Sequence, residues 1–69
     1  MNNEYTITVD FTPNAKDRVN ITCIDIDDFT EKCNTIIEEK SIDITNLRNI
    51  NKIFHDLTIE NLRYICLCK

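Results

Sequence analysis

Apolar and polar side chains alternate along the first part of the chain. Over residues 4–11 an apolar side chain stands at every second position: Tyr5, Ile7, Val9 and Phe11. Threonine and aspartate fill the positions between them. A period of two with aromatic and β-branched residues predicts a strand that buries one face.

The same alternation returns over residues 17–26. The inward-facing positions there are Val19, Ile21 and Cys23. The connecting segment TPNAK, residues 12–16, contains proline followed by asparagine, and both favour tight turns. The two segments together predict an antiparallel β-hairpin.

After the second strand the pattern changes period, and residues 28–40 fit a helix. The apolar side chains share one helical face: Phe29, Cys33, Ile36 and Ile37. Asp27 or Asp28 can cap the first turn, and Glu31 follows Asp28 at the spacing of a capping box.

A second helix is expected over residues 44–56, with Asp43 or Thr45 as its cap. Its apolar stripe consists of Ile44, Leu47, Ile50, Phe54 and Leu57, with Ile53 beside it. Its outer face would carry three basic side chains at helical spacing: Arg48, Lys52 and His55.

The C-terminal segment fits two structures. Thr58 as a cap, followed by apolar Ile59 and Leu62, favours a third helix over 58–67. The run RYICLC is rich in strand formers and apolar on both faces, which is typical of a central strand. A third strand over this segment is therefore the alternative.

These elements predict a single α+β domain over residues 1–69, with the hairpin packed against two or three short helices. The chain has no glycine, which excludes glycine-rich phosphate-binding loops. Asparagine, present nine times, is expected to supply left-handed backbone positions. Exposed strand edges are compatible with a homodimer.

Nothing in the pattern indicates a membrane protein or a secreted one. The longest apolar run is about five residues, at 64–68, and no secretory signal is recognisable at the N-terminus. We therefore expect a cytoplasmic protein with reduced thiols. Twelve isoleucines and nine asparagines, both with AT-rich codons, indicate an AT-rich genome.

The net charge of −4 is unevenly distributed. Residues 1–39 carry nine acidic and three basic side chains, whereas residues 40–69 carry three acidic and five basic ones. Phosphate backbones repel an acidic chain, so direct nucleic-acid binding is disfavoured and a basic protein partner is favoured. The expected binding face is an acidic belt of Asp25, Asp27, Asp28, Glu31, Glu38 and Glu39.

The four cysteines have a simpler explanation than metal or redox chemistry. Structural zinc sites use close cysteine pairs such as C-x₂-C, and this chain offers only the C-x-C of Cys66 and Cys68. Cys23 and Cys33 fall on predicted apolar faces, where free cysteine packs as a small hydrophobe. A metal site, with His55 as a further ligand, or a redox site is the less favoured alternative, and no cofactor is expected.

No catalytic set is recognisable, so we expect a protein that is not an enzyme. His55 and Asp56 are adjacent, and neighbours on a helix do not face each other. In size and composition alone the chain is similar to phage-encoded inhibitors of host defence nucleases, and no motif supports that link.

The favoured function is an inhibitor or adaptor, of phage or mobile-element origin, which blocks a larger basic nucleic-acid-handling protein by mimicking nucleic-acid charge. The alternative is a nucleic-acid or transcription-associated module that uses the basic face of Arg48, Lys52 and His55, together with Arg63.

Overall fold

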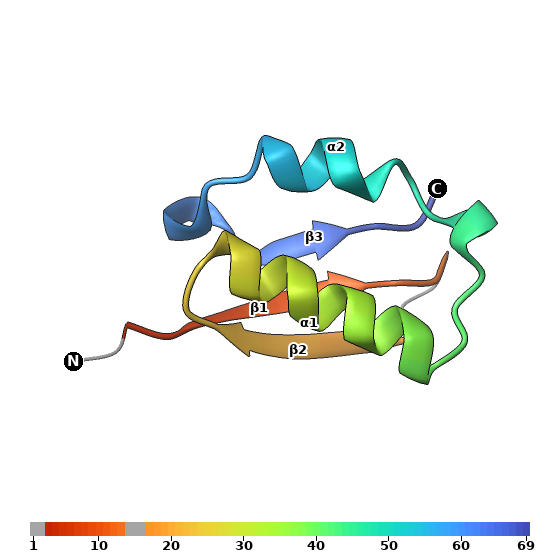
Figure 1. The fold of residues 1–69 in the computed structure, drawn as a ribbon, viewed down its shortest axis with the longest axis horizontal. Coiled ribbons are helices and arrows are strands. Elements are labelled where there is room, and N and C mark those ends of the chain that lie inside the picture. The colour runs from red at the N-terminus through yellow and green to blue at the C-terminus, as the bar shows by residue number, and fades with distance from the viewer. Residues whose placement is uncertain (1–2, 14–16) are drawn as a thin grey trace.

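The computed structural model describes residues 3–13 and 17–69 and confirms the α+β fold (Figure 1). Its strands are β1 (Tyr5–Asp10), β2 (Arg18–Cys23) and β3 (Tyr64–Cys66), and its helices are α1 (Ile26–Glu39) and α2 (Ile50–His55). Short 3₁₀ turns occupy Ile44–Asn46 and Ile59–Asn61. The turn expected over residues 12–16 lies mostly outside the described residues.

The three strands form one sheet in the order β2-β1-β3. β1 and β2 pair antiparallel, from Tyr5 opposite Cys23 to Asp10 opposite Arg18, which confirms the hairpin. β3 pairs parallel to β1, with Thr8 opposite Tyr64. β1 is therefore the central strand, and β2 is an edge strand.

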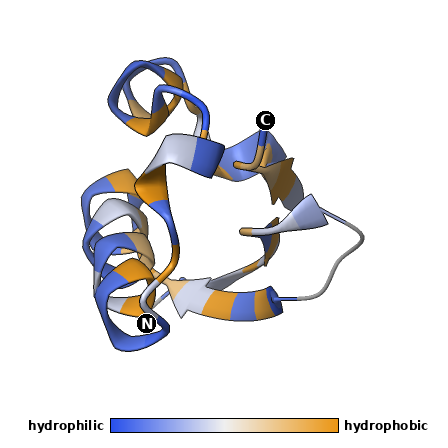
Figure 2. Ribbon diagram, turned by 90° about the vertical axis from the view of Figure 1, so that its right-hand side faces the viewer, coloured by the Kyte–Doolittle hydropathy of each residue, from blue (hydrophilic) through white to orange (hydrophobic). Residues whose placement is uncertain are grey.

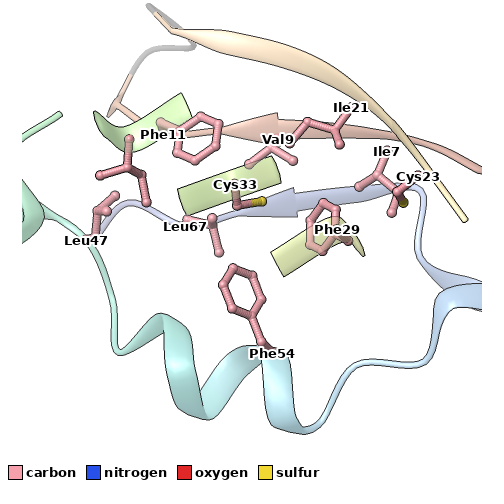
Figure 3. Packing of buried hydrophobic residues seen from close by; sticks show 11 residues of the cluster. Ile7, Val9, Phe11, Ile21, Cys23, Phe29, Cys33, Leu47, Phe54 and Leu67 are labelled. Atoms are coloured by element: carbon pink, nitrogen blue, oxygen red, sulfur yellow. The ribbon is translucent and has the colours of Figure 1, made fainter. Parts of the chain in front are cut away.

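Both helices cover the same face of the sheet (Figure 2). The alternation expected for β1 places Ile7, Val9 and Phe11 fully buried beneath them. The rings of Phe29 and Phe54 meet edge to face, with centroids 5.7 Å apart (Figure 3). The remaining members of the core are Ile21, Cys23, Cys33, Ile37, Leu47 and Leu67.

α1 begins two residues earlier than expected, and its cap is neither Asp27 nor Asp28. Asp25 is the N-cap, and its carboxylate accepts from the Asp28 amide at 2.8 Å. The predicted capping box of Asp28 and Glu31 is therefore wrong. The cap lies earlier than expected because β2 already ends at Cys23. Asp25, whose backbone is extended, then caps a helix that begins at Ile26.

The helix expected over residues 44–56 is wrong in its first half. Asp43 accepts hydrogen bonds from the amide and hydroxyl of Thr45 and holds only a 3₁₀ turn, which leaves Ile44 69% exposed. Leu47 then bridges Cys68, and the Arg48 amide donates to the Leu67 carbonyl at 2.8 Å. This pairing takes the backbone out of the helix, so α2 begins only after Asn49.

The C-terminal segment is a strand, so the helix favoured for 58–67 is wrong and the alternative is correct. Thr58 makes no side-chain cap and starts only a 3₁₀ turn. The Thr8 amide donates to the Arg63 carbonyl, and the Leu67 amide donates to the Asp10 carbonyl, both at 2.9 Å. Pairing with β1 thus overrides the local preference for helix.

Candidate protein-binding surface

The outer face of α1 carries a row of three carboxylates, Asp27, Glu31 and Glu38, which we call the acidic ridge. Their spacings of four and seven residues put them on one line of the helix. All three side chains are exposed. Among the described residues none of them makes a salt bridge or a side-chain hydrogen bond. Their charges are therefore available to a partner.

Two other members of the expected acidic belt, Asp25 and Asp28, stabilise the fold through hydrogen bonds. Asp25 caps α1 through the amide of Asp28. The Asp28 carboxylate accepts from the Ile24 amide at 3.0 Å and from the Lys32 ammonium at 3.1 Å. These two donors, the amide first, lower the pKa of Asp28 below its usual value. Asp25 and Asp28 thus hold the strand-to-helix junction together.

Glu39, the last member of the belt, lies beside a shallow groove between α1 and the outer edge of β2. The groove has a volume of about 260 Å³. Its lining consists of Asn20, Ile21, Thr22, Lys32, Thr35 and Ile36. Glu39 is not part of this lining and stands one helical turn beyond Thr35 on α1. The sequence offered no signal for the groove, because β2 could not be recognised as an edge strand.

The basic side chains do not form the expected helical stripe. Lys52 and His55 are exposed on α2, but Arg48 lies before the helix in the segment that pairs with residues 67–69. His55 Nδ1 lies 3.3 Å from Asp56 Oδ1, although the two were expected to face apart. Asp56 can reach the ring because it is the C-cap, outside the regular helix.

The cysteines fall into two places. Cys23 and Cys33 are buried in the core, and burial raises the pKa of both thiols, that of Cys33 to about 12. The Cys66 and Cys68 sulfur atoms lie 3.1 Å apart, and this contact, together with burial, raises the pKa of Cys68. Within the described ranges, no three His, Cys, Asp or Glu side chains gather in a way that could hold a metal ion.

The helix-free face of the sheet holds a polar cluster that the sequence analysis did not identify. Asp10 accepts from Arg18 Nε at 2.8 Å and from the Tyr64 hydroxyl at 2.5 Å. The Arg18 guanidinium also lies 5.9 Å from the centre of the Tyr64 ring. The hairpin pattern could have paired Asp10 with Arg18, but Tyr64 joins them only because β3 is a strand.

Comparisons with protein-family models, with curated proteins and with solved structures found no match to this chain. In the described part of the chain, no helix has the length and apolar character needed to cross a membrane.

Proposed function

We propose that this protein is a non-enzymatic acidic binding module, an inhibitor or adaptor for a larger basic partner that handles nucleic acid. The observation that carries the proposal is the acidic ridge, three exposed carboxylates in line on the longest helix. Asp25 and Asp28, by contrast, form hydrogen bonds that hold the start of α1. The ridge carboxylates make no such contact among the described residues.

The physical mechanism is the replacement of phosphates by carboxylates. Asp27 and Glu38 are eleven residues apart, which corresponds to about 16 Å along a helix. A row of negative charge of that length can enter a cationic groove that otherwise holds a nucleic-acid strand. The net charge of −4 also steers a basic partner toward the molecule. The four free thiols fit the reducing cytoplasm in which we place this function.

The test is a pull-down from host lysate at low salt with three versions of the tagged chain. The ridge variant carries Asp27→Asn, Glu31→Gln and Glu38→Gln. A matched control carries Glu4→Gln, Asp56→Asn and Glu60→Gln, so that both variants have lost three exposed acidic charges. We expect wild type and control to retain the same basic protein, and the ridge variant to lose it.

Salt provides the second readout. Binding of the purified partner should weaken as ionic strength rises past roughly 0.1 M, where the Debye length falls to about 10 Å. Equal capture by all three versions, or affinity that is insensitive to salt, would contradict the proposal.

A further inference from the structure

The outer edge of β2 has backbone groups that point away from the sheet. The Thr8 amide and the Asp10 carbonyl bond toward β3, so these residues of β1 turn their backbone groups away from β2. In an antiparallel pair, the residues opposite them do the same. Asn20, opposite Thr8, therefore directs its N–H and C=O outward at the free edge.

Lys32 supports this orientation and closes one end of the edge. Its ammonium donates to the Thr22 carbonyl at 2.5 Å, and Thr22 is two residues from Asn20 on the same strand. That bond is possible only if the even-numbered groups of β2 point outward. A lysine over a strand edge limits uncontrolled pairing. Here it covers Thr22 and leaves Asn20, whose outward N–H and C=O have no backbone partner among the described residues.

The groove beside this edge can take the side chains of an added strand. Ile36 and Ile21 supply its apolar surface, and Thr35 lies on its helix side. Glu31 and Glu39 flank Thr35 by one turn in each direction. Lys32, the charged side chain of the lining, is already paired with Asp28 at 3.1 Å. A partner lysine that lays its aliphatic stem on Ile36 would therefore meet the carboxylates of Glu31 and Glu39 beside the groove, which are unpaired among the described residues.

We infer that an extended basic segment of the partner protein adds to β2 as a fourth strand, with its backbone on Asn20 and its lysine or arginine side chains in the groove. This inference rests on the proposed function and specifies its mode of binding, which is strand addition to an exposed sheet edge. A second copy of this chain fits less well, because it would bring Glu31 and Glu39 against like charges.

The probe is a short synthetic peptide of alternating lysine and threonine, capped at both ends. A matched peptide with every backbone nitrogen methylated keeps the charges and loses the donors. We expect hydrogen exchange at the Asn20 amide to slow by about tenfold in saturating unmodified peptide, and the methylated peptide to bind about tenfold more weakly. Both effects are followed by NMR titration of the full chain.

Protein variants give an independent readout. Asn20→Pro and Asn20→Ala both remove the side-chain bond to Thr8, which is 2.9 Å long, but only proline also removes the outward N–H. We expect Asn20→Ala to retain binding of the unmodified peptide and Asn20→Pro to lose it. If the proline variant does not fold, the pair of peptides still decides the question.

Equal binding of both peptides, with shifts confined to the acidic ridge, would overturn strand addition and leave the proposed function standing. Binding of neither peptide would also overturn strand addition. The pull-down with the ridge variant would then test the proposed function independently. Protection of Asn20 without peptide, with a dimer in sedimentation, would assign the edge to a second copy instead.

Discussion

Asp10 shows how a single residue can be charged, buried and stable. It is 5% exposed, and donors reach its carboxylate from both neighbouring strands, Arg18 on β2 and Tyr64 on β3. These donors, Arg18 first, lower the pKa of Asp10 below its usual 3.8. The hydrogen bond between Tyr64 and Asp10 also raises the pKa of the Tyr64 hydroxyl. One carboxylate thus links all three strands on the helix-free face.

The lowered pKa of Asp10 predicts a pH dependence of stability. A carboxyl group whose pKa falls on folding adds stability above its unfolded value of 3.8, and this gain is lost as pH falls through the lower folded value. We expect Asp10→Asn to have a lower urea midpoint than wild type at pH 7, and the gap to close below pH 3.8. Urea titrations at a series of pH values measure this.

The same titrations include Glu38→Gln as the control, because its carboxylate makes no side-chain hydrogen bond among the described residues. The control should keep the wild-type midpoint at pH 7. A gap for Asp10→Asn that is equally wide at acid and neutral pH would show that charge on Asp10 is not what stabilises the sheet.

Ser41 occupies a left-handed backbone position that glycine usually takes, because the chain has no glycine. Its φ of 52° is the one positive value in the described residues, so a serine fills the position there that was expected of an asparagine, while Asn14 lies outside the described residues. The Ile42 amide donates to the Ile37 carbonyl, and the Ser41 amide donates to the Glu38 carbonyl, which together close the C-terminus of α1. Glycine is the usual residue at this position because it has no Cβ to clash.

Replacing Ser41 by glycine should therefore stabilise the protein. We expect Ser41→Gly to raise the free energy of unfolding by about 0.5–1 kcal/mol, since relief of left-handed strain outweighs the added freedom of the unfolded chain. Ser41→Ala keeps the Cβ and should give no gain. Chemical denaturation of the three proteins compares them, and an equal effect of alanine and glycine would refute the strain argument.

At the scale of elements, β3 is short but central to stability. It is followed by Leu67, which is fully buried, and the chain then continues into the pairing with residues 46–48. The segment thus bonds to β1 on one side and to the link before α2 on the other. A chain of this length buries only about 60% of its unfolded surface, so each core residue matters.

Truncation of Leu67 should therefore cost much of the total stability. We expect Leu67→Ala to lower the free energy of unfolding by about 2–5 kcal/mol, the range for buried leucine. The matched control is Ile44→Ala, because Ile44 is 69% exposed, and it should change the value by less than about 0.5 kcal/mol. Similar losses for the two variants in thermal or urea unfolding would mean that the C-terminal segment around Leu67 is not part of the cooperative core.

At the scale of the whole molecule, the acidic and the more basic halves of the sequence form different parts of the fold. The hairpin and α1 come from the acidic residues 1–39, and α2 and β3 come from the more basic residues 40–69. The molecule is elongated, 37 by 20 by 19 Å, with a radius of gyration of 11.5 Å. The acidic ridge and the groove both belong to the α1 side, so one partner could contact both at once.

The sequence by itself determined the hairpin, most of the first helix and the acidic character of that helix's outer face. Strict alternation from Tyr5 to Phe11 and the helical spacing of Phe29, Cys33 and Ile37 depend only on neighbouring residues. Once that helix is recognised, the positions of Glu31 and Glu38 on one outer line follow from the helical period, but Asp27 lay before the expected start at residue 28 and joins the line only because α1 begins at Ile26. Separating them from Asp25 and Asp28 already required the observed caps.

Only the tertiary structure decided the second half of the chain and the strand edge. Whether residues 64–66 form strand or helix depends on the backbone groups that β1 offers, and these lie more than fifty residues away in sequence. The break before α2 depends in turn on Leu67 and Cys68. The free edge at Asn20 exists because β3 joins β1 on its other side. Hydrogen bonds between distant segments leave no periodic signal in the residues that make them.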